Sequence, residues 1–458
     1  MSWPASCAGV RSATTIRAHA SDVCRVGAGE DVAAGGVDVA VGAEEGLPVP
    51  ADVVAVPGAD VAPLGATGTG GLTGPEQAAA AVVTRTNRAA AADDRALRRE
   101  RIRGTQRRYP RVAPSRSHPP PVGDDTLPDV TREPTPIVLD VDTGVDDACA
   151  LVLAATHPAL DLRAVTCVGG NAPVEDVVRN TLTVLESVGR ADVPVARGAA
   201  RPLLEHPQDA RHVHGDDGMA DLGWPAPGLR PDGRHAVELL RDVCLSAAAA
   251  GEQVTIVPTA PMTNIALLLR TFPAVAEGIA EIVFMGGAAH VGNATASAEF
   301  NVFHDPEAAA IALDAAADLS IPVTMYGLDV FYDPVVTREQ AAELVALGGR
   351  TGAELAGRLI EFQCERFGRD ASTIGDAGAV CAVIDPDGLT TEVLPIRVEL
   401  AGQFSRGRTI VDRRDWSGDL SHDPHGEPPV HVRVALGVDP ERYVALWLET
   451  IRTRAGGS

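Results

Sequence analysis

The segment Ile137-Val138-Leu139-Asp140-Val141-Asp142-Thr143-Gly144-Val145-Asp146-Asp147 passes from an apolar run to four aspartates, and a helical pattern follows over 146–156. Carboxylates this close together repel one another unless a positive group binds among them. A helix N-cap would explain one of these acids but not all four. In open α/β sheets ligands bind at the carboxyl ends of strands, and Ca²⁺ and Mg²⁺ take oxygen ligands. The segment therefore predicts a buried strand, a metal site and a helix, in that order.

The same alternation of apolar run and helical pattern recurs further along the chain. The expected strand and helix pairs are 137–141 with 146–156, 162–168 with 174–188, 254–257 with 263–270, and 282–285 with 306–316. Later strands, as an antiparallel edge, and a closing helix are expected at 393–400, 408–411, 430–436 and 440–451. The pattern predicts one α/β domain over 134–458, a large and mostly parallel open sheet with a Rossmann-like core and helices on both faces.

Composition narrows the classes of protein that fit. The chain has 458 residues, 45% of them hydrophobic, and a formal charge of −23, which argues against nucleic-acid binding. No apolar run approaches the roughly 18 residues of a membrane helix, so no membrane partner is expected. Seven cysteines lie far apart without zinc-binding spacing, and no secretory signal is visible at the N-terminus. These features favour a cytoplasmic protein.

The first part of the chain has a different composition. Residues 31–74 cycle through Val, Ala, Gly, Asp and Pro without Phe, Tyr, Trp, Ile or Met, and residues 85–116 are rich in Arg. A basic arm for an anionic partner is one interpretation. A solvated tail, or a start codon placed too early, explains the same composition. We expect residues 1–133 to be a low-complexity, disordered extension.

Two other families of metal-dependent proteins share part of the aspartate pattern. An EF-hand loop that begins at Asp140 would need Gly and an acid where Val145 and Leu151 stand, so that interpretation fails. A Mg²⁺-dependent phosphatase of the haloacid-dehalogenase type would use Asp140 as nucleophile and Asp142 as acid. Such phosphatases need a lysine, and the chain has none, so this family stays only as an alternative.

Further motifs follow the aspartates in a fixed order. They are Gly169-Gly170-Asn171, His214-Gly215-Asp216-Asp217-Gly218, Pro258-Thr259-Ala260-Pro261-Met262-Thr263-Asn264, Met285-Gly286-Gly287, and Gly292-Asn293 leading to Glu299-Phe300-Asn301 and Asp305-Pro306-Glu307-Ala308-Ala309. Together with the strand-end aspartates they resemble the inosine-uridine preferring nucleoside hydrolases over about residues 136–455. The resemblance does not extend to residues 1–133.

The resemblance implies an N-glycosyl hydrolase that uses tightly bound Ca²⁺ to release ribose and a free base from ribonucleosides. The implied Ca²⁺ ligands are Asp142, Asp147, the backbone carbonyl of Thr259, and Asp376. Asp142 would also be the general base toward water, and Asp140 would orient the ligands. The implied ribose-binding residues are Asp146, Asn171, Met285, Asn293, Glu299, Asn301 and Asp376. The family also implies a homodimer or homotetramer, and a role in nucleoside salvage.

One position departs from the family pattern. Members usually have a His immediately before the last Asp ligand, where it assists the departing base, but here Gly375 precedes Asp376. His214 is the candidate replacement acid, and His304 is expected to be structural. A His introduced at position 375 is expected to raise turnover. If nothing replaces the acid, the chain could instead be a relative that binds nucleosides and turns them over poorly. The sequence motifs do not identify the preferred base, because variable loops make the contacts to it.

Overall fold

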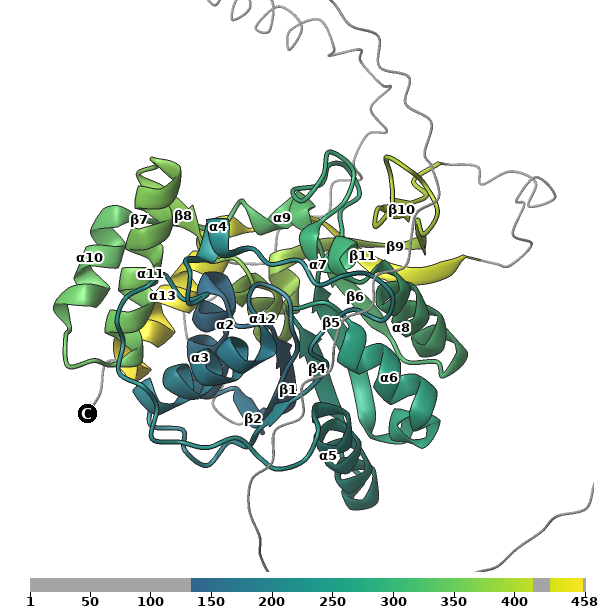
Figure 1. Ribbon diagram of the computed structural model, residues 1–458, viewed down its shortest axis with the longest axis horizontal. Coiled ribbons are helices and arrows are strands. Elements are labelled where there is room, and N and C mark those ends of the chain that lie inside the picture. The colour runs from purple at the N-terminus through teal and green to yellow at the C-terminus, as the bar shows by residue number, and fades with distance from the viewer. Residues whose placement is uncertain (1–132, 415–428, 456–458) are drawn as a thin grey trace, which may run out of the picture. The chain divides into compact units, whose positions relative to one another are not determined.

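The computed structural model describes residues 133–414 and 429–455 (Figure 1). Apart from Glu133, the extension expected at 1–133 lies outside the described residues, so its predicted disorder stays a prediction. Within the described part, no helix combines the length and the apolar character that crossing a membrane requires.

A nine-stranded sheet forms the centre of the described part, in the order β10-β9-β11-β6-β5-β4-β1-β2-β3. Its strands are β1 (Thr135–Val141), β2 (Leu160–Cys167), β3 (Val195–Arg197), β4 (Val254–Pro258), β5 (Ile279–Met285), β6 (Val323–Tyr326), β9 (Leu389–Val398), β10 (Thr409–Val411) and β11 (Val430–Val438). Neighbours from β11 to β3 pair in parallel, and β9 pairs antiparallel with β11 and β10. The predicted parallel sheet with an antiparallel edge is confirmed.

Strand β1 shows why the decisive segment folds as it does. Ile137 and Leu139 belong to the apolar core on one face of the sheet, whereas Val138 belongs to the core on the other face. A strand buried on both faces is apolar at every position until it ends. Asp140 is the second-last residue of β1, and the other three aspartates follow the end of the strand, so the four lie around the carboxyl edge of the sheet.

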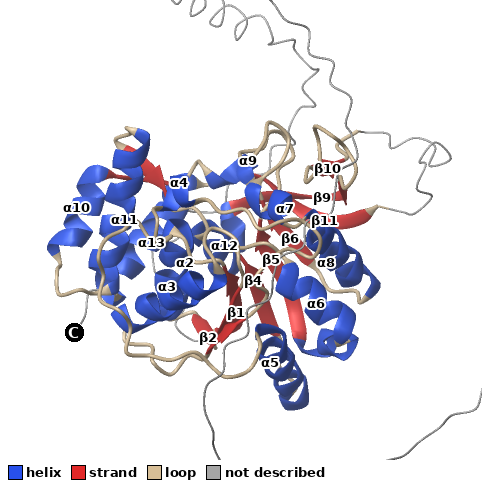
Figure 2. Ribbon diagram, in the orientation of Figure 1, coloured by secondary structure: helices blue, strands red, loops and turns tan. Residues whose placement is uncertain are grey.

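Helices cover both faces, as predicted (Figures 1 and 2). One core contains residues of α2 (Val145–Thr156), α3 (Val174–Ser187), α9 (Leu328–Phe331), α10 (Arg338–Ala346), α11 (Gly352–Phe367), α12 (Ala377–Ile384) and α13 (Pro440–Arg454). The other core contains residues of α5 (Ala236–Ala250), α6 (Thr263–Thr271) and α8 (Pro306–Asp318). Short helices α4 (Arg211–His214) and α7 (Phe300–His304), and a two-stranded sheet of β7 (Val335–Thr337) and β8 (Ala371–Thr373), complete the elements around the site.

The observed bounds extend or shift several expected elements. Strand β9 begins at Leu389, before the expected residue 393, because its pairing with β11 runs to the pair Leu389 and Val438. Helix α5, strand β6 and helices α9 to α12 had no counterpart among the expected elements. Three of them, α9, α11 and α12, contribute residues to the candidate site.

Candidate active site

A pocket of about 690 Å³ opens near the carboxyl ends of β1, β4 and β5. Its lining brings together most of the side chains that the sequence predicted for the site. These are Asp146, Asn171, His214, Thr259, Met285, Asn293, Glu299, Asn301 and Asp376. The remaining two, Asp142 and Asp147, are fully buried and accept hydrogen bonds from the side chain of Asn171. Segments far apart in the sequence therefore meet in one place.

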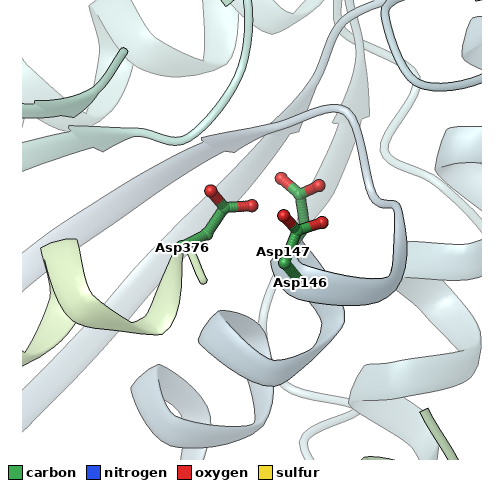
Figure 3. Close-up of side chains that lie close together, drawn as sticks. All are labelled: Asp146, Asp147 and Asp376. Carbon is green, nitrogen blue, oxygen red and sulfur yellow. The ribbon is translucent and has the colours of Figure 1, made fainter. Parts of the chain in front are cut away.

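Three carboxylates lie close together, as Figure 3 shows. Asp146 and Asp376 line the pocket, and the buried Asp147 lies next to them. We call these three, with Asp142, the floor of the pocket. Asp146 and Asp147 come from the first turn of α2, and Asp376 is the N-cap residue of α12. Each offers an oxygen atom, and these oxygens all lie within 4.8 Å of one another. The Asp147 carboxylate is fixed by the backbone N–H of Gly144, at 2.9 Å, and by the Thr259 hydroxyl, at 2.7 Å. Oxygen ligands at this spacing suit a hard divalent cation.

Burial and mutual repulsion raise the pKa values of these acids. Burial raises the pKa of Asp146 to about 6, and burial with repulsion from Asp146 raises that of Asp147 to about 6. The pKa of Asp376 lies well above its ordinary value, because the group is buried and faces the other carboxylates. One oxygen of Asp146, Oδ1, is buried without a hydrogen-bond partner. A bound cation would relieve both the repulsion and this unsatisfied oxygen, so the residues present fit a metal ion.

Asp142 lies beside the cluster and is held by Asn171. The backbone N–H of Asn171 donates to Asp142 Oδ2 at 2.7 Å, and its side-chain amide donates to Oδ1 at 3.1 Å. A Cβ atom on Gly170 would come within 2.0 Å of Asp142 Oδ2, so only glycine allows this close approach. Burial, and then repulsion from Asp147, raises the pKa of Asp142 well above its ordinary value. A raised pKa suits a group that must accept a proton.

The side chain of Asp140 is hydrogen-bonded to the neighbouring strand and to α6. Its Oδ1 accepts hydrogen bonds from the Thr166 hydroxyl at 2.6 Å and from the Asn264 amide at 2.8 Å. Its backbone carbonyl accepts the Thr259 N–H at 2.9 Å. Asp140 thus ties β1 to β2 and to the start of α6. These contacts favour the predicted orienting role over direct ligand binding.

The polar wall opposite α2 is built around Glu299, the N-cap of α7. Its carboxylate accepts the backbone N–H groups of Gly287, Asn301 and Val302, at 2.9, 2.8 and 3.1 Å. Burial raises the pKa of Glu299 to about 7. The Asn301 amide donates to the carbonyl oxygens of Thr259, at 3.0 Å, and Met285, at 3.2 Å. One network therefore joins the ends of β4 and β5 to α7.

The two histidines named from the sequence differ in position. His214 is buried in the pocket wall, and its Nδ1 accepts the backbone N–H of Val145 at 3.1 Å. Burial lowers the pKa of His214 to about 4, so near neutral pH its ring is uncharged. An uncharged ring whose Nδ1 accepts carries its proton on Nε2, and it can donate a hydrogen bond there. His304 lies outside the pocket lining, 5.7 Å from the Phe300 ring, as expected for a structural residue.

The structure argues against placing a histidine at position 375. Gly375 has a φ of 57°, which side chains rarely adopt, and a Cβ atom there would lie 2.5 Å from Cβ of Asp146. The expectation that Gly375→His raises turnover therefore has no physical support, because the new side chain would displace Asp146.

The pocket lining also contains residues that the sequence analysis did not single out, and we call them the mouth of the pocket. They are Phe331, Tyr332, Gln363, Phe367, Arg369 and Ser372, from α9, the end of α11 and β8. No polar strand-end motif marks them. A compositional signal existed nonetheless, because the whole chain has only 8 Phe and 4 Tyr, and five of these line the pocket, with Phe300 and Phe303 joining the three above. Scarce aromatic side chains gathered at one opening indicate a surface for a planar ligand.

Comparison with known proteins places the chain among enzymes. The sequence model of the inosine-uridine preferring nucleoside hydrolase family matches residues 137–445. The nucleoside hydrolase of that name from Crithidia fasciculata is 36% identical, over 69% of this chain and 98% of its own length. A pyrimidine-specific ribonucleoside hydrolase from Escherichia coli is 40% identical, also over 69% of this chain and 98% of its own length.

Solved structures agree with the sequence relatives. A purine-preferring ribonucleoside hydrolase from Gardnerella vaginalis superimposes with a TM-score of 0.62 at 29% identity, covering 70% of this chain and 99% of its own. A plant nucleoside hydrolase superimposes with a TM-score of 0.63 at 26% identity, with the same coverage. With the pocket and its ordered motifs, these matches show that the chain belongs to the inosine-uridine preferring nucleoside hydrolase family of N-glycosyl hydrolases.

Proposed function

We propose that this protein is a Ca²⁺-dependent hydrolase that cleaves the N-glycosidic bond of ribonucleosides to give ribose and a free base. The observation that carries the proposal is that three close carboxylates, two of them in the lining of the pocket, lie at the same pocket as the amides and the acid of the opposite wall. The phosphatase alternative loses its support, because the chain belongs to the nucleoside hydrolase family.

In the proposed metal site, Asp142, Asp147, Asp376 and the carbonyl of Thr259 hold the Ca²⁺. Asp146 offers an oxygen within 4.8 Å of oxygens of Asp147 and Asp376, so it is placed to bind either the metal or a sugar hydroxyl. When bound there, Ca²⁺ would make water more acidic. Asp142 would be the base that accepts the proton from the attacking water. Asn171 keeps the Asp142 carboxylate aimed, because it binds both carboxylate oxygens.

The sugar would lie between the carboxylate floor and the wall of α7. A furanose presents hydroxyl groups that ionised carboxylates and amides bind well in a partly dry pocket. We assign this binding to Asp146, Asn171, Asn293, Glu299, Asn301 and Asp376, with Met285 against the sugar ring. Cleavage of the bond builds positive charge on the ring, and the surrounding acids stabilise that charge.

The names of the relatives do not fix the base. They include inosine-uridine preferring, pyrimidine-specific and purine-preferring enzymes. The departing base finds no histidine at position 375, and His214 offers a neutral N–H rather than a charged acid. Because the usual acid is missing at position 375, a second candidate function is nucleoside binding with poor turnover.

The experiment that tests the proposal measures release of reducing sugar from uridine, cytidine, inosine and adenosine, with and without a Ca²⁺ chelator. Hydrolysis of at least one nucleoside, its loss with chelator and its recovery with added Ca²⁺ are expected. Turnover that is unchanged by the chelator would rule out a metal ion that is required for catalysis. Binding of nucleosides without sugar release would instead establish the second candidate.

A further inference from the structure

The mouth of the pocket carries one side chain whose charge contrasts with its surroundings. Arg369 is the single arginine among the described residues that line the pocket, which also contains Asp146, Asp209, Glu299 and Asp376. Within residues 133–414 and 429–455, Arg369 forms no ion pair. A permanently charged guanidinium that no carboxylate neutralises, at the opening of an acidic pocket, is available to a ligand.

The backbone and the aromatic neighbour fix where this guanidinium lies. Helix α11 ends at Phe367, and Gly368 follows in the left-handed conformation, with a φ of 61°. The Arg369 N–H then donates to the Cys364 carbonyl at 2.9 Å, and the Arg338 side chain donates to the Arg369 carbonyl at 2.9 Å. The guanidinium carbon lies 5.8 Å from the centre of the Phe367 ring. Stacking on an aromatic ring restrains an arginine without consuming its N–H donors.

The position of Arg369 suits contact with the base of a bound nucleoside rather than with its sugar. Most of the proposed sugar-binding side chains, among them Asn171, Glu299 and Asp376, are buried, whereas Phe367 is 49% exposed and Tyr332 is 48% exposed. A base attached to a sugar at the floor would extend toward this opening. When the N-glycosidic bond breaks, its electron pair stays on the base, and carbonyl oxygens on the ring share the negative charge. Position 375 offers no side chain to protonate that base.

We propose that Arg369 stabilises the negative charge on the departing base by donating N–H hydrogen bonds to its carbonyl oxygens, and so favours nucleosides whose base carries such oxygens. The inference deepens the proposed hydrolase function and rests on it. The C–N bond breaks with both electrons going to the base, water adds to the sugar, and the base takes its proton from solvent after departure. No proton transfer from Arg369 is needed, because arginine acts here only as a donor of hydrogen bonds.

The test compares inosine, adenosine and p-nitrophenyl riboside in Arg369→Met, Arg369→Lys and Arg358→Met proteins. Arg358 is the matched control, since it lies on α11, pairs with Glu354 and is not in the pocket lining. In Arg369→Met, kcat/KM for inosine should fall by about 10- to 100-fold, the range for losing a charged hydrogen bond. The p-nitrophenyl riboside should change by less than about threefold, because its leaving group disperses its own charge. Adenosine should fall less than inosine, Arg369→Lys should keep part of the inosine activity, and Arg358→Met should match the wild type.

Each remaining outcome overturns the inference. An equal fall for all three substrates would assign Arg369 a general positioning role, and no change for inosine would show that it has no part in the reaction. A wild-type protein that cleaves none of the ribosides would overturn the proposed function and this inference with it. Cleavage by the wild type with unchanged selectivity in Arg369→Met would overturn the inference alone.

Discussion

The floor and the mouth of one pocket are built on opposite physical principles. At the floor, buried acids repel one another and are held by backbone N–H groups, hydroxyls and amides from separate strand ends. At the mouth, half-exposed aromatic rings and Arg369 come from α9, α11 and the segment after it. A change at the floor disturbs several partners at once, whereas a change at the mouth removes one contact. The floor should therefore govern whether catalysis occurs, and the mouth should govern which base is accepted.

The largest expected effect is at the floor, in Asp376→Asn. This change keeps the shape of the side chain but removes a proposed metal ligand, so Ca²⁺ binding should be lost and turnover should fall by at least about 100-fold. The metal-free variant should nevertheless be more stable than the metal-free wild type near pH 7, by about 1 kcal/mol or more, because one repelling charge is gone. Equilibrium dialysis with Ca²⁺, sugar release and denaturant unfolding in chelator measure these quantities.

The pH dependence of that stability difference follows from the raised pKa of Asp376. At a pH above the pKa that Asp376 has in the unfolded chain, Asp376 is ionised there without meeting other charges. In the folded chain the ionised Asp376 is repelled by the neighbouring carboxylates unless it binds a proton. The wild type should therefore gain stability relative to Asp376→Asn as the pH falls from 8. The stability difference between the two proteins should vanish at the pH where Asp376 is protonated in both the folded and the unfolded chain. Asp192→Asn, at an exposed acid paired with Arg190, should show neither effect. Equal stability of Asp376→Asn and the wild type at pH 8 would contradict the repulsion at the floor.

Position 375 gives the next effect. Gly375→Ala and Gly375→His should lower turnover and destabilise the protein by about 1–3 kcal/mol, from the left-handed backbone together with the clash against Asp146. Gly189→Ala separates the two causes, because Gly189 also has a left-handed φ, of 72°, but an added Cβ would meet nothing within 4 Å. Gly189→Ala should lose stability alone. A Gly375→His protein with raised nucleoside turnover would show that the loop can move and the floor is less rigid than we infer.

The same contrast explains what the sequence could predict. The acids around the end of β1 were predictable because ligands bind at the carboxyl edge of a parallel sheet. Thr259 and Asp376 were named only from the family resemblance, and Asp376 follows β8 of the small sheet rather than a strand of the main sheet. The sheet itself was predictable because its inner strands contain apolar runs such as Ile137 to Leu139 in β1. The mouth was not predictable, since Tyr332 and Phe367 sit on helices whose positions depend on packing between distant segments. The clash at Gly375 likewise depends on the distance to Asp146, which spacing along the chain does not contain.

A smaller effect is expected from Tyr332→Ala at the mouth. Tyr332 is half-exposed and contacts Phe331 edge to face, with ring centres 5.0 Å apart. Loss of a ring against which a base can stack costs about 1–3 kcal/mol, so KM should rise about tenfold. The value of kcat for p-nitrophenyl riboside should stay close to the wild-type value, because the floor is untouched. Steady-state kinetics on inosine and the riboside measure KM and kcat separately. A fall in kcat for both substrates would show that the mouth also contributes to bond cleavage.

The last prediction is that removing residues 1–133 has no effect. It tests the proposed boundary between an extension at 1–133 and a catalytic domain at 134–458. Every floor and mouth residue named here follows β1, and the first backbone bond of that strand runs from the Thr135 N–H to the Ala159 carbonyl at 2.8 Å. A chain that begins at Pro134 therefore keeps the whole sheet and both regions of the pocket. We expect it to match the full chain in Ca²⁺ affinity, in kcat/KM for each nucleoside and in melting temperature. A loss of turnover with unchanged Ca²⁺ affinity would mean that the first 133 residues act on the mouth. A loss of both would mean that the floor needs them to fold, and the boundary would then be wrong.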